Sequence, residues 1–355
     1  MRVLAPTHTC FAFDTPGFGD SDPVTIAGDG VAELVDAMAE TVAVLRMPRC
    51  AVFGSHTGAA IALEFGRRHP ERVTGLVLDG VPMYSAVEQT ALFQGYFEPL
   101  DIDEHGGHFA HVWTRFRDLF QWFPWTHRDP QYLNSADVPT AERLQLWVTM
   151  FYRAAAHYIP AYRAAIAYGN TAQQAVADLH VPAVFMAQDT DMLFSHLDRL
   201  PPLAANQRIV RVRQGSKPQA ILDAVTQFDT VAPAPCDVRS GGACESARQF
   251  IDLHHGQVQV RTIGAIDAPV LLYLHDVPGS SALIEPRLLQ LAADFRIVSL
   301  DLPGSGESPP LAASAPLRRN GWACATPGSC RCSGRARLFR TANPRAGSSR
   351  RAMRS

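Results

Sequence analysis

Short apolar runs alternate with helical patterns in the first 80 residues, and this alternation constrains the fold more than any other feature of the sequence. Apolar residues recur at helical spacing over 31–45 and again over 59–69. Next to these patterns, 50–53 and 76–78 are uninterrupted apolar runs of strand length. Such strands are typical of a parallel sheet that helices cover on both faces. We therefore predict an α/β fold with a mostly parallel sheet.

The middle of the chain differs in composition from the segments around it. Four of the five Trp residues lie within 84–178, which contains helical patterns such as 143–158 and no clear strand. Strand-like apolar runs return at 181–186 and 208–212. We predict that 84–178 is a helical cap inserted into the sheet of a first module, 1–230.

An eight-residue segment occurs twice in the chain. The first copy, 14–21, reads Asp-Thr-Pro-Gly-Phe-Gly-Asp-Ser, and the second, 301–308, reads Asp-Leu-Pro-Gly-Ser-Gly-Glu-Ser. Each copy follows a short apolar run, 10–13 or 297–300, which predicts a buried strand. Two copies this far apart indicate two related modules and not a short-period solenoid.

Charge is distributed unevenly along the chain. The net charge is −2, but 318–355 hold ten Arg and neither Asp nor Glu, which leaves 22 basic against 34 acidic residues in 1–317. An acidic body argues against nucleic acid as a partner, because phosphate binding needs clustered cations. The segment 312–355 has neither a helical nor a strand period, and we expect a disordered basic tail that reflects the end of the gene.

Cysteine usage and hydropathy favour the cytoplasm. The seven Cys are scattered and give no disulfide framework. No apolar run approaches the length of a membrane span, and the first 13 residues lack a signal core. Every basic residue except Lys217 is Arg, which indicates a GC-rich, bacterial-like coding bias. We expect a cytoplasmic protein with a small-molecule substrate and no membrane partner.

The turn at 54–58, Gly-Ser-His-Thr-Gly, lies between an apolar run and a helical pattern. Flanking glycines let the central residue occupy a strained strand-to-helix turn and present its side chain above the sheet. This turn, the segment 14–21 and the run 67–79 together resemble the α/β-hydrolase superfamily, above all its cap-bearing branch of epoxide hydrolases, haloalkane dehalogenases and carbon–carbon bond hydrolases. The resemblance covers about 9–228 as one module and 248–311 as part of another.

The chain departs from this family at the centre of the turn. The family has Ser, Asp or Cys there, because acyl or alkyl transfer needs a nucleophile that a neighbouring His activates. Here the residue is His56, which leaves three roles open: nucleophile, general base for water, or a side chain that lines a pocket. The resemblance places the acid after 181–186, where Asp189 and Asp191 are candidates and Asp191 matches better. It places a base His where 213–218 has none, so the conventional relay is absent.

The resemblance also implies an oxyanion hole. Backbone N–H groups that follow His56, beginning with Thr57, would bind the oxyanion. Asp276 would contribute from 275–280, His-Asp-Val-Pro-Gly-Ser, which is similar to the family's His-Gly-x-Pro-Gly loop. The first module has no such loop of its own, so we expect the second module to supply it.

The second copy of the eight-residue segment belongs to a partial second module. This module occupies 248–311, after a linker at 231–247, and has strand-like runs at 258–263 and 269–274. The resemblance implies an N-truncated first copy and a C-truncated second copy. Family members place their third strand between the fourth and fifth, which leaves a gap in the first sheet. We predict that the two strands of the second module fill this gap and form one permuted domain.

Aromatic cap residues and one serine are candidates for substrate binding: Ser55, Trp113, Trp122, Trp125 and Tyr152. Three His residues at 105, 108 and 111 would suit a metal on a regular helix, but two glycines interrupt it, so we expect neither a metal nor a cofactor. The features together predict hydrolysis of a small, largely apolar ester, epoxide or related carbon compound, with His56 and Asp191 as catalytic residues. The alternative is a catalytically inactive hydrolase-fold protein that binds ligands, or a truncated gene product.

Overall fold

The computed structural model describes residues 3–229 and 246–310, apart from residues 29, 48, 135, 136 and 255. The chain divides into two compact units, Met1–Ser240 (unit 1) and Gly241–Ser355 (unit 2). Most of the predicted linker and the whole of the predicted tail lie outside the described residues. In the described part of the chain, no helix combines the length and the apolar character needed to cross a membrane.

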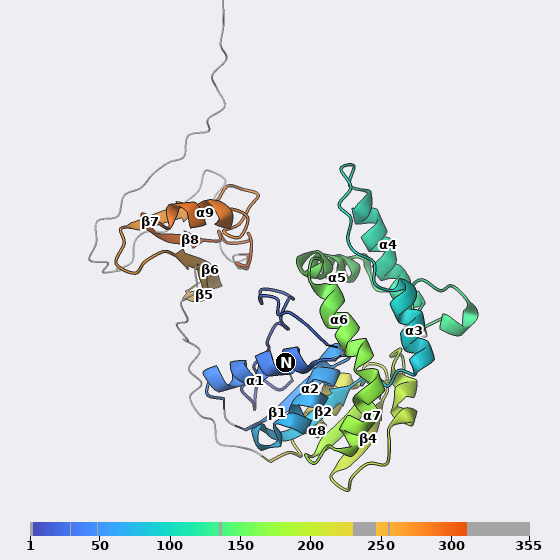
Figure 1. Ribbon diagram of the computed structural model, residues 1–355. Coiled ribbons are helices and arrows are strands. Elements are labelled where there is room, and N and C mark those ends of the chain that lie inside the picture. The colour runs from blue at the N-terminus through green and yellow to red at the C-terminus, as the bar shows by residue number, and fades with distance from the viewer. Residues whose placement is uncertain are drawn as a thin grey trace, which may run out of the picture. The chain divides into compact units, whose positions relative to one another are not determined.

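Unit 1 is built on a parallel sheet of four strands (Figure 1). The strands follow one another in chain order: β1 (Cys50–Ser55), β2 (Val73–Asp79), β3 (Ala183–Gln188) and β4 (Gln207–Val212). Every residue of β2 is buried, because helices cover both faces of the sheet. The predicted α/β fold with a parallel sheet is confirmed.

Helices pack on the sheet through two separate hydrophobic clusters. Successive residues of a strand point to opposite faces, so Leu76 belongs to one cluster and Val77 to the other. The helices are α1 (Ala32–Val44), α2 (Thr57–Arg68) and α7 (Gly169–Ala177) on the Leu76 face, and α8 (Lys217–Val225) on the Val77 face.

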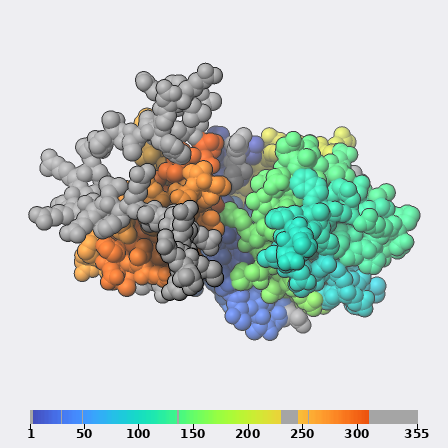
Figure 2. Space-filling model, turned by 90° about the horizontal axis from the view of Figure 1, so that it is seen from above, coloured from blue at the N-terminus to red at the C-terminus, as the bar shows by residue number. Residues whose placement is uncertain are grey.

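The segment 84–178 is helical, as predicted. Its helices before α7 are α3 (Ala86–Gly95), α4 (Gly107–Gln121), α5 (Ala141–Ala154) and α6 (Tyr158–Ala167). All of them lie between β2 and β3 in the sequence, and Figure 1 shows them above the sheet. Seen from above, the cap residues, coloured cyan to green, form most of the visible surface of unit 1 (Figure 2).

The run 10–13 is not a strand, and the prediction for it is wrong. It is irregular, with Phe11 packed against the core and Phe13 exposed. None of the described strands pairs with it. A strand without a partner leaves its N–H and C=O groups unbonded, so apolar character alone does not produce one.

Unit 2 has a four-stranded sheet of its own, with the order β5-β6-β8-β7. Its strands are β5 (Ser246–Leu253), β6 (Gly256–Ile263), β7 (Val270–Leu274) and β8 (Arg296–Leu300). β7 and β8 are parallel and the other pairs are antiparallel. Helix α9 (Glu285–Leu291) packs on this sheet through Leu288. The strands predicted at 258–263, 269–274 and 297–300 are confirmed. The completion of the first sheet by the strands of the second module stays a prediction.

The two copies of the repeated segment have the same local conformation. Ser21 Oγ donates to the carbonyl of Asp14 at 2.8 Å, and Ser308 Oγ donates to the carbonyl of Asp301 at 2.8 Å. The corresponding glycines have nearly equal positive φ angles, for example 84° at Gly17 in the first copy and 82° at its counterpart in the second. This conformational match supports the interpretation of the two segments as copies of one motif.

Candidate active site

His56 occupies a strained turn between β1 and α2. Its φ of 51° and ψ of −111° lie in a region that L-residues rarely adopt, and its N–H donates to the carbonyl of Asp79 at 2.8 Å. A side chain at Gly54 would overlap with the backbone of Gly58, which explains the glycine at position 54. The turn therefore has the geometry predicted for a nucleophile elbow, with an imidazole at its centre.

Asp191 lies beside His56. The Oδ2 atom of Asp191 is 2.9 Å from the Nε2 atom of His56, and Asp191 Oδ1 accepts the Leu193 N–H at 2.9 Å. Burial raises the pKa of Asp191, but three neighbours outweigh this effect and lower the pKa below its usual value. They are His56, through its hydrogen bond and charge, the Leu193 N–H, and the charge of Lys217. The carboxylate is thus ionised at neutral pH and accepts from Nε2–H. This arrangement leaves Nδ1 of His56 as the atom that can take up a proton.

The structure distinguishes the two aspartates proposed as the acid. The Asp191 side chain is 9% exposed and contacts His56, whereas Asp189 is exposed and its N–H continues the sheet by donating to the carbonyl of Val212 at 2.8 Å. Only the first of these carboxylates contacts the elbow.

Ser55 points to a different partner from His56. Its Oγ donates to Asp79 Oδ2 at 2.9 Å, and the Nζ of Lys217 donates to the same oxygen at 2.9 Å. Neither Asp79 nor Lys217 was among the predicted site residues. Two signals were available: Asp79 directly follows an apolar run, and Lys217, the single lysine, lies in the segment 213–218, where the resemblance implies a base His.

These side chains come from the carboxyl ends of four successive parallel strands. Ser55 ends β1 and His56 follows it, and Asp79 ends β2. Asp191 lies in the loop after β3, and Lys217 is the first residue of α8, which follows β4. Ligands of open α/β sheets bind at this edge, because the loops that follow parallel strands converge there. The sheet therefore brings together residues that are up to 162 positions apart in the sequence.

The first turn of α2 provides a donor for an oxyanion. In the part of the chain that the structure describes, no acceptor contacts the Thr57 N–H, while the Ala59 and Ala60 N–H groups bond to the carbonyl of His56. Asp276, the other predicted oxyanion residue, belongs to unit 2. There, the neighbouring His275 accepts the Leu302 N–H at 3.0 Å. A role for Asp276 stays a prediction.

The predicted aromatic residues lie within the packing of the cap. Trp113 and Tyr152 join a cluster between α4 and α5, and Tyr152 Oη donates to the carbonyl of His108 at 3.1 Å. Trp125 contacts the guanidinium of Arg115, 5.2 Å from its ring centre, and Trp122 forms an isolated bridge with Leu133. Substrate binding by Ser55, Trp113, Trp122, Trp125 and Tyr152 stays a prediction.

The His residues at 105, 108 and 111 do not converge. His105 and His111 contact the carboxylates of Glu104 and Glu98, and His108 accepts the N–H of Asp103. Among the described residues, no group of three or more potential ligands could hold a metal ion.

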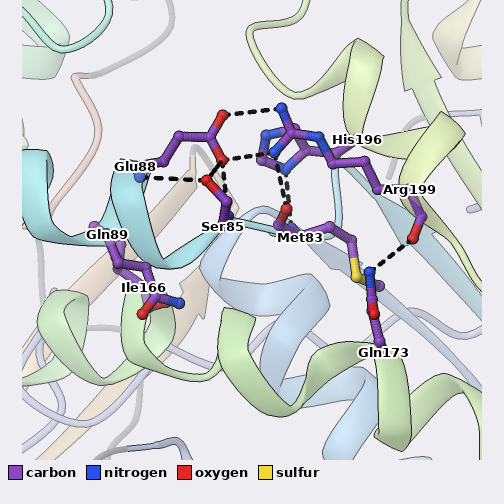
Figure 3. A network of polar contacts seen from close by, with 8 residues as sticks. All are labelled: Met83, Ser85, Glu88, Gln89, Ile166, Gln173, His196 and Arg199. Atoms are coloured by element: carbon purple, nitrogen blue, oxygen red, sulfur yellow. Dashed lines mark hydrogen bonds and ion pairs between the residues drawn. The ribbon is translucent and has the colours of Figure 1, made fainter.

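A partly buried polar network connects the start of the cap to the segment that follows Asp191 (Figure 3). Arg199 forms two hydrogen bonds with Glu88 on α3 and donates to the carbonyl of Met83 at 3.0 Å. The Met83 N–H donates to Nδ1 of His196 at 2.9 Å. Burial, followed by the charge of Arg199, lowers the pKa of His196 to about 4, so His196 is a neutral acceptor.

This network restrains the loop that carries Asp191. His196 and Arg199 belong to η3 (Phe194–Arg199), which begins three residues after Asp191. Burial alone raises the pKa of Glu88, but hydrogen bonds from Arg199 and Ser85 lower it to about 2, so its carboxylate is ionised over the whole neutral range. The cap is therefore anchored beside the candidate site by an ion pair and a neutral histidine.

Comparison with known proteins assigns the fold family. The α/β hydrolase fold family matches residues 1–216, and the chain belongs to this family. A proline iminopeptidase from Arabidopsis thaliana is 31% identical over 108 residues, which are 30% of this chain and 26% of that protein. The chain thus matches about a quarter of the length of this relative.

Two solved structures are also similar. Rv0554 from Mycobacterium tuberculosis has a TM-score of 0.46 at 17% identity, over 64% of this chain and 82% of that one. Epoxide Hydrolase A from Mycobacterium thermoresistibile has a TM-score of 0.40 at 16% identity, over 61% of this chain and 82% of that one.

Proposed function

We propose that the protein hydrolyses a small, largely apolar ester, epoxide or related carbon compound, with His56 as the general base that activates water. The contact of 2.9 Å between His56 Nε2 and Asp191 Oδ2 carries this proposal. This contact orients the imidazole and sets its tautomer at the carboxyl edge of a parallel sheet. The aromatic residues of the cap support the apolar substrate class.

The proposed reaction on an ester uses water as the nucleophile. Nδ1 of His56 takes one proton from water while the water oxygen attacks the carbonyl carbon. The Thr57 N–H donates to the resulting oxyanion, and Asp191 stabilises the imidazolium. The tetrahedral intermediate then expels the alkoxide, which takes the proton from Nδ1. The products are one carboxylic acid and one alcohol, and His56 returns to its neutral form.

Substitution of His56 tests this mechanism. We expect the purified chain to hydrolyse p-nitrophenyl esters or styrene oxide, and His56→Ala to lower kcat/KM about 100-fold or more. Asp191→Asn removes the charge that orients the imidazole and should also lower kcat/KM, whereas Asp189→Asn in the same loop serves as the matched control.

The assay also separates the alternative mechanisms. An acyl group on His56, found by mass spectrometry after a rapid quench, would establish the imidazole as nucleophile and not as base. Activity that persists in His56→Ala would exclude His56 from the reaction. A folded wild-type chain without any turnover would favour the second function, ligand binding without catalysis.

We propose a small molecule as the partner and the cytoplasm as the location. The scattered cysteines, which give no disulfide framework, and the acidic body support this assignment. Binding to DNA, RNA or lipid vesicles at physiological salt would contradict it.

A further inference from the structure

Lys217 lies between two carboxylates of the candidate site. Its ammonium donates to Asp79 Oδ2 at 2.9 Å and is 3.9 Å from Asp191 Oδ2. The second of these oxygens is the one that accepts from His56. Lys217 is the first residue of α8, so its backbone position is set by the packing of that helix on the sheet. A single cation thus connects the carboxylate that orients His56 with a second carboxylate nearby.

Asp79 is a buried carboxylate with little to stabilise it apart from Lys217. Its side chain is 2% exposed, compared with 29% for Lys217. Within the described residues, its Oδ1 has no hydrogen-bond partner, and Oδ2 receives the Ser55 hydroxyl and the Lys217 ammonium. A buried carboxylate that loses its cation is strongly destabilised, because neutral donors do not balance its charge.

An uncompensated charge on Asp79 would affect His56 directly. Gly80, the next residue in the chain, approaches the imidazole so closely that an added Cβ would be 2.7 Å from His56 Cδ2. The Asp79 carboxylate is linked to the imidazole through Lys217 and Asp191, so a second, unbalanced anion in this group would stabilise the imidazolium and thereby remove the proton acceptor. A cation held against Asp79 cancels this effect.

We propose that Lys217 is a positioning residue of the site: its ammonium neutralises Asp79, so that Asp191 alone orients His56 and the imidazole stays a proton acceptor at neutral pH. This inference rests on the proposed function of His56 as a base. Lys217 lies where the resemblance implies a base histidine, and its proposed role is to balance charge and not to transfer a proton.

Several charged or titratable groups face His56 from the elements around it. Lys217 and Asp79 form one pair of opposite charge, and the proposal concerns this pair. The groups are Asp79 at the end of β2, Asp191 after β3, His196 in η3 and Lys217 on α8.

NMR titration of the His56 imidazole in the full chain tests the proposal without relying on turnover. In Lys217→Met, the midpoint of the His56 titration should rise by about half a pH unit or more, because the Asp79 charge is no longer balanced. In Asp79→Asn it should fall, since the lysine charge is then unbalanced. The double variant should return to near the wild-type midpoint, and Lys217→Arg, which keeps the charge, should match the wild type.

The acidic limb of the kcat/KM pH profile should move in the same directions as the NMR midpoints. Midpoints unchanged in both single variants, or a double variant displaced as far as Lys217→Met, would overturn the proposal. If Lys217→Met does not fold, Asp79→Asn and the double variant decide the question, because neither contains an unpaired buried carboxylate. A chain that shows these shifts but hydrolyses nothing would refute the proposed function and leave the role of Lys217 intact.

Discussion

The conformation of His56 is maintained by its immediate neighbours. Its N–H is bound by the carbonyl of Asp79 at 2.8 Å, and its own carbonyl accepts the Ala59 N–H at 2.9 Å, so both sides of a strained residue are held. The ring lies so close to Gly80, whose φ is 67°, that an added Cβ would be 2.7 Å from Cδ2 of the ring. Absence of a side chain at this glycine is therefore what allows the imidazole to reach Asp191.

Gly80→Ala should disturb this contact. The new Cβ would collide with the ring, which must then move away from Asp191, and we expect kcat/KM to fall at least tenfold in the hydrolysis assay. Gly215→Ala is the matched control, since Gly215 has a φ of 82° but open space around it. Both variants should lose about 1 kcal/mol of stability from backbone strain. Equal activity in the two variants would show that contact with Gly80 does not position His56.

At the level of elements, α3 and η3 are joined by few but well-defined contacts. Helix α3 begins with a capping box, in which Ser85 accepts the Glu88 N–H and the Glu88 carboxylate accepts the Ser85 N–H. The same carboxylate pairs with Arg199 on η3, and His196 on η3 accepts from Met83. Glu88 thus completes the N-terminal capping box of α3 and also binds the segment after Asp191.

The neutral state of His196 makes the stability of this junction dependent on pH. Its folded pKa is lowered from 6.5 to about 4, so the unfolded chain binds more protons between these values and stability falls as the pH drops from 6.5 toward 4. We expect a loss of about 2 kcal/mol from this residue between pH 7 and pH 5.

Urea unfolding at the two pH values measures this loss. In His196→Asn the side-chain oxygen can still accept the Met83 N–H but does not titrate, so the loss should be smaller than in the wild type. An equal loss in both proteins would show that His196 is not the group responsible.

At the scale of the whole molecule, the described residues form two sheets, and each sheet has an edge strand that pairs with one described strand. β1 pairs with β2 in unit 1, and β7 pairs with β8 in unit 2. The outer edge of such a strand presents unpaired N–H and C=O groups. Completion of the first sheet by strands of the second module is our prediction from the sequence.

Amide hydrogen exchange in the full chain tests that prediction. If a strand covers the outer edge of β1, alternate β1 amides should exchange slowly, and Leu272→Pro in β7 should accelerate them because proline cannot donate in a ladder. Fast exchange of these amides in both proteins would contradict sheet completion.

Patterns of local origin could be predicted from the sequence. The strands 50–53 and 76–78, the elbow and the helical segment 84–178 follow from the periodicity and turn chemistry of adjacent residues. Strand β5 escaped prediction because polar residues interrupt it and it begins in the predicted linker. The run 10–13 has the composition of a strand and lacks the partner that would make it one.

Some features of the candidate site could likewise be predicted from the sequence, and others only from the structure. The sequence by itself determined that an imidazole stands at the centre of an elbow and that Asp191 follows a later strand, because both depend on spacing along the chain. Only the tertiary structure decided that Asp79 and Lys217, 138 residues apart, meet beside this pair. Their contact depends on the order and register of four parallel strands, and hydrogen bonding and packing between distant segments determine that order.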